Sequence, residues 1–277
     1  MRRTVYLPVL TFPHAPTQRA LDAALQAAQV VQADLSATVY SADLPTSSAS
    51  IAGLVIGVSD MIAKVENDSR ATAEVLAATI RRLAEGKGVT AEVETRAALP
   101  ADAKGALVRA ARYHDLVILP WDPDNLTGKE VAEAVIFGSG RPSLIVPEGS
   151  ALSSLRHVTV AWDGSRVAAR ALADALPLLA DTARLTVLTV DDDKTLEADV
   201  GTRLTEALRR KGFEADHRAL SGNGRPVAHT LQEASGQLGA DMLVMGGYGH
   251  SRMRDFIVGG ATLGILAHPT LPILISH

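Results

Sequence analysis

One pattern of apolar runs and amphipathic stretches occurs twice along this chain of 277 residues, and a repeat of this length restricts the folds that the chain can form. The clearest correspondence lies between His114–Leu119 and Ala240–Met245, where an Asp precedes four apolar residues. Both halves also close alike, at Pro142–Val146 and at Pro272–Ile275. Near-continuous apolar strands separated by helices are typical of a parallel sheet covered on both faces. We therefore expect two tandem doubly wound α/β domains, each with a five-stranded parallel sheet.

The remaining segments of the two halves pair in the same way. The first half has apolar runs at 4–10, 35–40 and 89–95 and helical stretches at 17–33, 60–85 and 102–113. The second half has apolar runs at 157–162, 185–190 and 213–220 and helical stretches at 166–180, 194–211 and 226–238. The chain is about twice the usual domain size, and the boundary falls near Glu148–Leu155. This divides the chain into domains at 1–150 and 151–277, and the short link between them predicts that they pack together.

Composition narrows the classes of function. Aromatic residues make up 4% of the chain against 47% hydrophobic residues, so the cores should be built from Ala, Val and Leu. The net charge of −4 argues against non-specific nucleic-acid binding, which needs a clustered basic face. No stretch approaches the roughly 20 apolar residues that span a bilayer. The basic opening is expected to form a strand rather than a signal peptide, because Pro8 interrupts its apolar run. Without cysteine there is no disulfide or thiol chemistry, and we expect a cytoplasmic protein with no membrane partner.

A glycine-spaced segment follows the fourth apolar run of the second half, with Gly246, Gly249 and Gly259 as its regularly spaced positions. Glycines at the mouth of a strand let the backbone approach a ligand closely and turn N–H groups toward an anion. Residues 260–267 are predicted to form a helix whose positive end faces the same place. Strand, glycine loop and helix together predict a phosphate cradle.

The spacing Gly-x2-Gly-x9-Gly resembles the nucleotide-binding signature of the universal stress protein family, and Val158–Ser165 resembles the opening strand of that family. The resemblance covers both halves, whereas the nucleotide motif occurs in the second half alone. It implies a Rossmann-like fold, of the adenine nucleotide alpha hydrolase-like kind, with strand order 3-2-1-4-5 in each half. It also implies an adenine nucleotide (ATP, ADP or AMP) as the ligand, and it leaves open whether Mg²⁺ accompanies the phosphates.

The resemblance also assigns roles to individual residues. Asp163 corresponds to the residue that contacts adenine, and Val190 to the position whose backbone lines the adenine pocket. Gly246, Gly249 and Gly259 correspond to the glycines that wrap the ribose and the phosphates. Asp163 has an alternative interpretation from the sequence itself, as a cap on the helix that begins shortly after it.

The chain departs from the family pattern at Gly260, where the family usually has Ser or Thr. The lost hydroxyl contact would cost about 0.5–1.5 kcal/mol of binding free energy, which would weaken binding or let AMP bind about as well as ATP. His250, Ser251, Arg252 and Arg254 lie between the second and third glycines and could neutralise phosphate charge. The alternative is that this stretch is a solvated basic loop.

The first half lacks the nucleotide motif. Pro120, Trp121 and Pro123 stand where the second half has glycines, and the two prolines remove backbone donors. No Asp follows the first strand in Thr11–His14. We therefore expect a degenerate domain without a nucleotide site, in which Trp121 plugs the crevice or packs at an interface.

The sequence favours binding over catalysis. No general base is placed to activate a water, so we expect no catalytic residues and at most slow ATP hydrolysis. Asp191–Asp193 is interpreted as a solvated turn, and the spacing of the histidines identifies no zinc site. We interpret the chain as a stress-response sensor or signalling module that binds an adenine nucleotide. The alternatives are a slow ATP hydrolase, or a scaffold without nucleotide that binds an unidentified protein partner or forms a homodimer through its edge strands.

Overall fold

The computed structural model describes residues 2–44, 58–150, 152–180, 182–191, 196–247 and 261–277. The first half contains β1 (Arg3–Leu10), α1 (Gln18–Val30), β2 (Ala33–Ala42), α3 (Val58–Gly86), β3 (Ala91–Ala98), α4 (Pro100–Ala111), β4 (Leu116–Trp121), α5 (Leu126–Gly138) and β5 (Ser143–Pro147). The second half contains β6 (His157–Ala161), α6 (Arg166–Ala175), a 3-10 turn (Leu176–Leu178), β7 (Arg184–Asp191), α7 (Val200–Arg210), β8 (Glu214–Ser221), α8 (Val227–Gln237), β9 (Met242–Gly246), α9 (Ala261–Ala267) and β10 (Ile273–Ser276). Strands and helices alternate as the repeat predicts.

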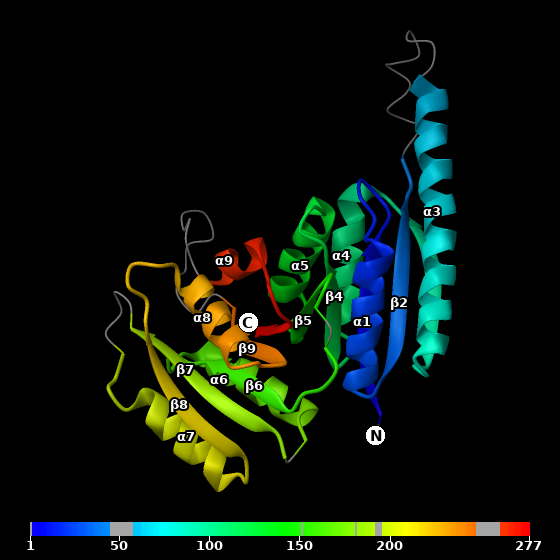
Figure 1. Cartoon of the computed structure of the whole chain (residues 1–277). Helices are drawn as coiled ribbons and strands as arrows, with labels where there is room; N and C mark the ends of the chain where they lie inside the picture. The colour runs from blue at the N-terminus through cyan, green and yellow to red at the C-terminus, as the bar shows by residue number, and fades with distance from the viewer. Residues whose placement is uncertain (1, 45–57, 151, 181, 192–195, 248–260) are drawn as a thin grey trace.

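The strands form a single ten-stranded sheet in the order β3-β2-β1-β4-β5-β10-β9-β6-β7-β8 (Figure 1). Counted within each half, this is the order 3-2-1-4-5 twice, which confirms the expected fold class and strand order. Neighbouring strands within each half run parallel. Their order reverses beside the first strand of each half, between β1 and β4 and between β6 and β9.

The two halves join where β5 pairs with β10, and this pairing is antiparallel, with Ile145 opposite Ile273 and Leu144 opposite Leu274. All four side chains are fully buried. The two leucines belong to the core on one face of the sheet and the two isoleucines to the core on the other. The fifth strand of each half is therefore interior, which confirms that the halves pack together. The edges of the sheet are β3 and β8.

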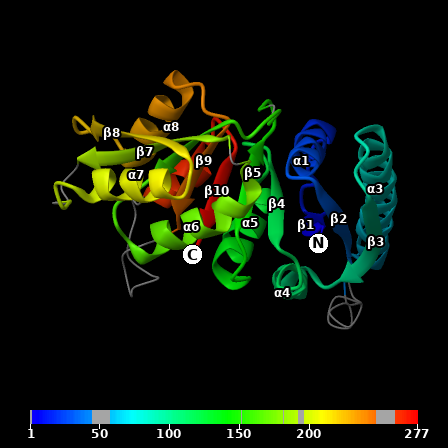
Figure 2. The same cartoon turned by 90° about the horizontal axis from the view of Figure 1, so that it is seen from below.

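Helices cover both faces of the sheet, as Figure 2 shows for β1 and β2, with α1 and α3 on one side and α4 on the other. One buried cluster gathers residues of α1, α3, α6 and α7, and the other gathers residues of α4, α5, α8 and α9. Alternation along β1 sends Val5 and Leu7 into the first cluster and Tyr6 into the second. Helix α1 buries mainly alanine, at Ala20, Ala23, Ala24, Ala27 and Ala28, as the composition predicts.

Helix α3 reaches well past the end of the sheet (Figure 1) and is tied to it near the carboxyl ends of β1 and β2. The Ser69 hydroxyl accepts a hydrogen bond from the backbone N of Ala42 at 2.8 Å and lies 2.6 Å from the Thr11 hydroxyl. Glu66 accepts from the backbone N of Leu44 at 2.7 Å. These buried contacts fix the end of β2 in the first half.

Candidate functional site

The carboxyl ends of β6 and β9 lie side by side at the point where the strand order of the second half reverses. Val158 of β6 pairs with Met242 of β9, and Val160 pairs with Val244. Strand β6 leads directly into Asp163, and β9 ends at Gly246. Ligands of open α/β sheets bind at such a reversal. The structure therefore brings Asp163 and Gly246, which are far apart in the sequence, to the adjacent carboxyl ends of two paired strands.

Asp163 lies in a tight turn between β6 and α6. Its Oδ1 accepts a hydrogen bond from the backbone N of Ser165 at 3.0 Å. The cap of α6 is Ser165 itself, whose Oγ accepts from the backbone N of Ala168 at 3.2 Å. Asp163 is thus not the cap, and within the parts of the chain that the structure covers no group donates to its Oδ2. One carboxylate oxygen shapes the turn and the other remains available.

Gly164 completes this turn for two reasons. Its φ of +73° lies in the left-handed region that glycine adopts without strain. A Cβ at this position would also come within 3.1 Å of Val200 Cγ2, at the start of α7. The turn therefore requires glycine, independently of any ligand.

Gly246 is held in close contact with the first turn of α6. A Cβ on Gly246 would lie 2.6 Å from the backbone N of Ala168 and 2.6 Å from the carbonyl carbon of Val167. Both are backbone positions that a rotamer change cannot move. The first glycine of the predicted motif is therefore required by the packing of β9 against α6.

Gly247, the next residue, is fixed by backbone and terminal contacts. Its N donates to the Ser276 carbonyl at 2.7 Å, and its carbonyl lies 2.9 Å from His277 Nδ1. A Cβ on Gly247 would meet Ile275 Cγ2 at 3.0 Å and Ile136 Cγ2, from α5 of the first half, at 3.7 Å. The start of the glycine loop thus rests on both halves of the molecule.

Val190 lies near the end of β7 with its side chain buried in the core. The turn after β8 lies over this end of β7, because the backbone N of Gly222 donates to the Asp191 carbonyl at 3.3 Å. A Cβ on Gly222 would be 3.8 Å from Val190 Cγ1. If Val190 contacts a ligand, it does so through its backbone, as the resemblance implies.

The rest of the predicted cradle lies outside the described residues. This applies to Gly249, His250, Ser251, Gly259 and Gly260, so their contribution stays a prediction. Of the acidic run after β7, Asp191 ends the strand, while Asp192 and Asp193 also lie outside. The described residues contain no group of three His, Asp or Glu that could hold a metal ion.

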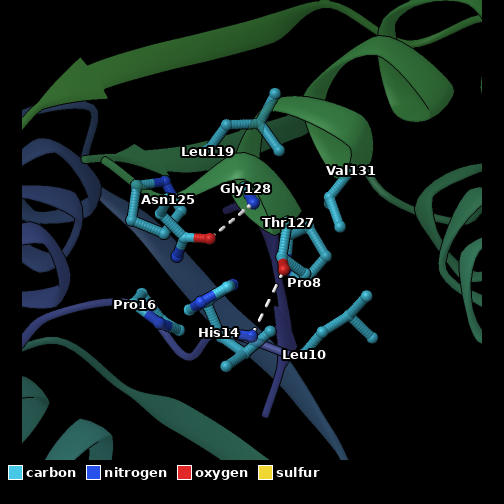
Figure 3. Close-up of a pocket in the computed structure, with 11 residues that line it drawn as sticks. Pro8, Leu10, His14, Pro16, Leu119, Asn125, Thr127, Gly128 and Val131 are labelled. Atoms are coloured by element: carbon cyan, nitrogen blue, oxygen red, sulfur yellow. Dashed lines mark hydrogen bonds between the residues drawn. The ribbon is translucent and has the colours of Figure 1, made fainter. Parts of the chain in front are cut away.

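The corresponding place in the first half, between the ends of β1 and β4, is closed by side chains (Figure 3). Asn125 caps α5 by accepting a hydrogen bond from the backbone N of Gly128 at 2.9 Å. The Thr127 hydroxyl accepts from the backbone N of His14 at 3.3 Å. The space between these residues is about 20 Å³, enough for about one water molecule.

Trp121, at the end of β4, is 2% exposed and belongs to the core cluster that extends across both halves. Its backbone carbonyl accepts a hydrogen bond from the N of Glu148 at 2.7 Å. Among the described residues, its indole Nε1 has no hydrogen-bond partner. Trp121 therefore fills the core and does not present its ring to a ligand.

A larger cavity, of about 230 Å³, opens beside this filled crevice at the ends of β1, β2 and β3. Its wall includes Phe12 and Pro13 from the β1–α1 loop and Tyr40 from β2. Lys104 of α4 and Glu130 of α5 line it as well, with Lys104 Nζ 2.7 Å from Glu130 Oε2. Burial raises the pKa of Tyr40, and the guanidinium of Arg96 opposes this only in part. Tyr40 therefore presents a neutral hydroxyl at physiological pH.

Sequence reasoning missed this cavity. One signal in the sequence could have indicated it. The β1–α1 connection spans residues 11–17, whereas the corresponding connection of the second half spans only residues 162–165. The cavity arises from side chains that five separate elements bring together, so no short segment of the sequence contains it.

Comparison with known proteins supports the architecture. Residues 154–277 match the model of the Universal stress protein family. A curated universal stress protein from Synechocystis sp. is 29% identical over 146 residues, which cover 51% of this chain and 49% of that protein. The match therefore spans about half the length of this relative.

A solved structure extends the likeness to the whole chain. A universal stress protein from Archaeoglobus fulgidus DSM 4304 aligns with 98% of this chain and 97% of its own, at 18% identity and a TM-score of 0.70. At that identity the likeness shows the fold. Because it covers both halves, the fold of the whole chain has a counterpart among solved structures. None of the described helices is long and apolar enough to cross a bilayer.

Proposed function

We propose that the second half, of which residues 154–277 match the Universal stress protein family model, binds an adenine nucleotide at the carboxyl ends of β6 and β9. Asp163 accepts a hydrogen bond from the adenine amine, and the backbone of Val190 lines the adenine pocket. The glycine loop from Gly246 through Gly260 holds the ribose and the phosphates. We propose residues 151–277 as the nucleotide-binding domain and residues 1–150 as its degenerate partner.

The observation that carries this proposal is the meeting of Asp163 with the start of the glycine loop at the reversal of strand order. Asp163 has one carboxylate oxygen engaged by Ser165 and the other without a donor among the described residues. A carboxylate oxygen at the end of a parallel strand suits an amine or a hydroxyl of the ligand. The glycine spacing that follows Gly246 supplies the phosphate-binding part.

The role that fits such a site is sensing or signalling in a stress response. Bound nucleotide would favour one arrangement of the glycine loop, and a protein partner that binds that arrangement better would respond to nucleotide. In this proposal Asp163 contacts adenine and no residue is assigned as a general base to activate a water, so we expect any hydrolysis to be slow.

Thermal unfolding of the purified protein tests nucleotide binding directly. Unfolding is followed with ATP, ADP, AMP and GTP, each with and without Mg²⁺, after bound nucleotide from purification has been excluded. A ligand at 100 times its dissociation constant stabilises the fold by about 2.7 kcal/mol. We expect a shift with adenine nucleotides and none with GTP. No shift with any nucleotide would contradict the proposal.

Two variants assign the site. Gly249→Val blocks the approach of the phosphates and should abolish the shift. Asp163→Asn keeps a side-chain oxygen for the Ser165 N–H but replaces the free carboxylate oxygen with a donor. It should weaken adenine nucleotide binding about tenfold or more, the size of one hydrogen bond to a charged group. Glu206→Gln, on the exposed face of α7, is the matched control. Folded Gly249→Val protein that binds ATP like the parent would refute the site.

A scaffold without nucleotide remains the second candidate. The packing of Gly246 against α6 favours it, because this glycine is required without any ligand. The sequence also favours the scaffold, because Gly260 lacks the hydroxyl that the family usually has at this position. Such a scaffold would bind a protein partner or a second copy of the chain, but the edge strand β3 exposes Glu92, Glu94 and Arg96, and charged edges oppose strand-to-strand pairing.

Release of product from ATP over hours, lost in Asp163→Ala, would instead indicate a slow hydrolase.

A further inference from the structure

We propose that the first half contains a second binding site, in the cavity at the ends of β1, β2 and β3, for a small aromatic carboxylate. The aromatic ring lies against the apolar wall, and the carboxylate pairs with Lys104 in place of Glu130. This site is independent of the nucleotide site, because none of its residues comes from the second half.

The size of the cavity sets the size of the ligand. A cavity of about 150 Å³ admits benzene, so the volume of about 230 Å³ here accommodates one aromatic ring with a short side chain. Sites for drug-sized molecules are larger, roughly 300–1,000 Å³. The cavity alone therefore encloses much less than a whole nucleotide.

The wall of the cavity favours an aromatic ring. Leu10, Ala42, Ala98 and Ala103 contribute aliphatic surface, and all four are buried or partly buried. Tyr40 adds a ring with a neutral hydroxyl, and Phe12, which is 38% exposed, stands at the entrance. Aromatic side chains pack against a ligand ring edge to face or offset, so Phe12 can close over a bound ring.

The polar end of the cavity is the ion pair between Lys104 and Glu130, which joins α4 to α5. The side chains of Lys104 and Glu130 are 42% and 62% exposed. Exposed pairs of this kind contribute little to stability, so Glu130 can turn to water when a ligand carboxylate takes its place. Arg96, near Tyr40, is ion-paired with Glu94, as Lys104 is with Glu130. Arg109 also lies near the Tyr40 hydroxyl, and among the described residues it forms no ion pair. This unpaired cation beside the cavity favours an anionic ligand.

Two prolines reduce the number of backbone donors that the cavity offers to an anion. Pro13 in the cavity wall and Pro100 at the start of α4 carry no backbone N–H. A carboxylate held by one ammonium group requires fewer donors than a phosphate does. The chemistry of the wall thus favours a carboxylate over a phosphate.

The test uses phenylacetate as the probe, followed by changes in the amide NMR spectrum of the full-length protein. Two compounds of similar size serve as charge controls, neutral 2-phenylethanol and cationic phenethylamine. We expect phenylacetate to shift signals of residues around Lys104, with affinity above that of 2-phenylethanol and well above that of phenethylamine. No shifts at these residues, or an affinity for phenethylamine equal to that for phenylacetate, would overturn the proposal.

Three variants separate the ring from the charge. Lys104→Gln should weaken phenylacetate binding about tenfold, as expected for loss of one charge-assisted contact, and leave 2-phenylethanol unchanged. Glu130→Gln should strengthen phenylacetate binding, because the competing carboxylate is gone. Ala103→Leu fills the cavity and should abolish binding of both compounds.

Matched surface changes complete the test. Lys64→Gln, on the exposed part of α3, and Glu133→Gln, on the exposed face of α5, should bind phenylacetate like the parent. Lys104→Gln and Glu130→Gln replace exposed side chains and are expected to fold, so the test does not depend on Ala103→Leu. Equal affinity of the parent and Lys104→Gln for phenylacetate would refute the role of the ammonium group.

Discussion

The two halves of the molecule have the same strand order and the same sequence of helices, yet the ends of their first and fourth strands differ. In the second half, β6 leads into the tight Asp163–Gly164 turn, and Gly246 at the end of β9 packs closely against the first turn of α6. In the first half, Trp121 is buried and Asn125 and Thr127 close the same place. A new cavity has formed to one side of it.

This difference shows which parts of the fold determine ligand chemistry. The sheet and its cores depend on the apolar repeat, which both halves retain. The connections at the carboxyl ends of the first and fourth strands differ between the halves in sequence. Glycine at this point in one half, and proline and tryptophan in the other, are accommodated by the same strand order.

The largest effect should come from Trp121→Ala. Removing a buried tryptophan costs about 3–5 kcal/mol of unfolding free energy, and urea unfolding measures it. Trp121→Phe should cost much less, because the indole Nε1 has no partner in the described part of the chain and its loss strands no other group. A loss below about 1 kcal/mol in Trp121→Ala, the cost of a minor core change, would mean that the side chain does not hold the first half together.

Gly246→Ala tests the glycine that aligns with Pro120 when the two halves are superimposed in sequence. The added Cβ would lie 2.6 Å from the backbone N of Ala168, so we expect a loss of about 1–3 kcal/mol, typical of overpacking. Pro120→Ala adds no atom and should stay within about 1 kcal/mol. Calorimetric unfolding of both variants makes the comparison. Unchanged stability of Gly246→Ala would contradict the packing requirement and leave ligand binding as the reason for this glycine.

The smallest effect concerns the helix that follows the first strand of each half. Thr17 caps α1 and Ser165 caps α6, each accepting a hydrogen bond from the backbone N three residues later. Thr17→Ala and Ser165→Ala should each cost about 1 kcal/mol. The second bond of Thr17, to the exposed Glu148, should add little. Chemical denaturation measures both losses of unfolding free energy. Losses that differ severalfold would show that the two caps are not equivalent.

The sequence predicted the architecture well because the apolar repeat dominates it. The stretch expected at 60–85 is α3 (Val58–Gly86), and the strand order inferred from the resemblance is the one observed. The antiparallel junction was not predicted, because the pattern of β5 and β10 says nothing about which strand each pairs with across the boundary.

The details of the sites were harder to predict. Asp163 was weighed as a helix cap, but that role belongs to Ser165. Gly246 was assigned to ligand contact alone, yet its closest neighbours are backbone atoms of α6. The cavity beside Lys104 depends on how α4 and α5 approach each other. Such distances between separate elements follow from tertiary packing and leave no local pattern in the sequence.

The antiparallel pairing of β5 with β10 also decides how the molecule can meet its surroundings. It reverses the strand direction from one half to the other, so the carboxyl ends of the two sets of strands lie at opposite margins of the common sheet. The cavity at Lys104 is lined by the first half alone, whereas Asp163 and Gly246 belong to the second. A ligand held by one half therefore shares no lining residue with a ligand held by the other, and each half can be changed by mutation without altering the contacts of its neighbour.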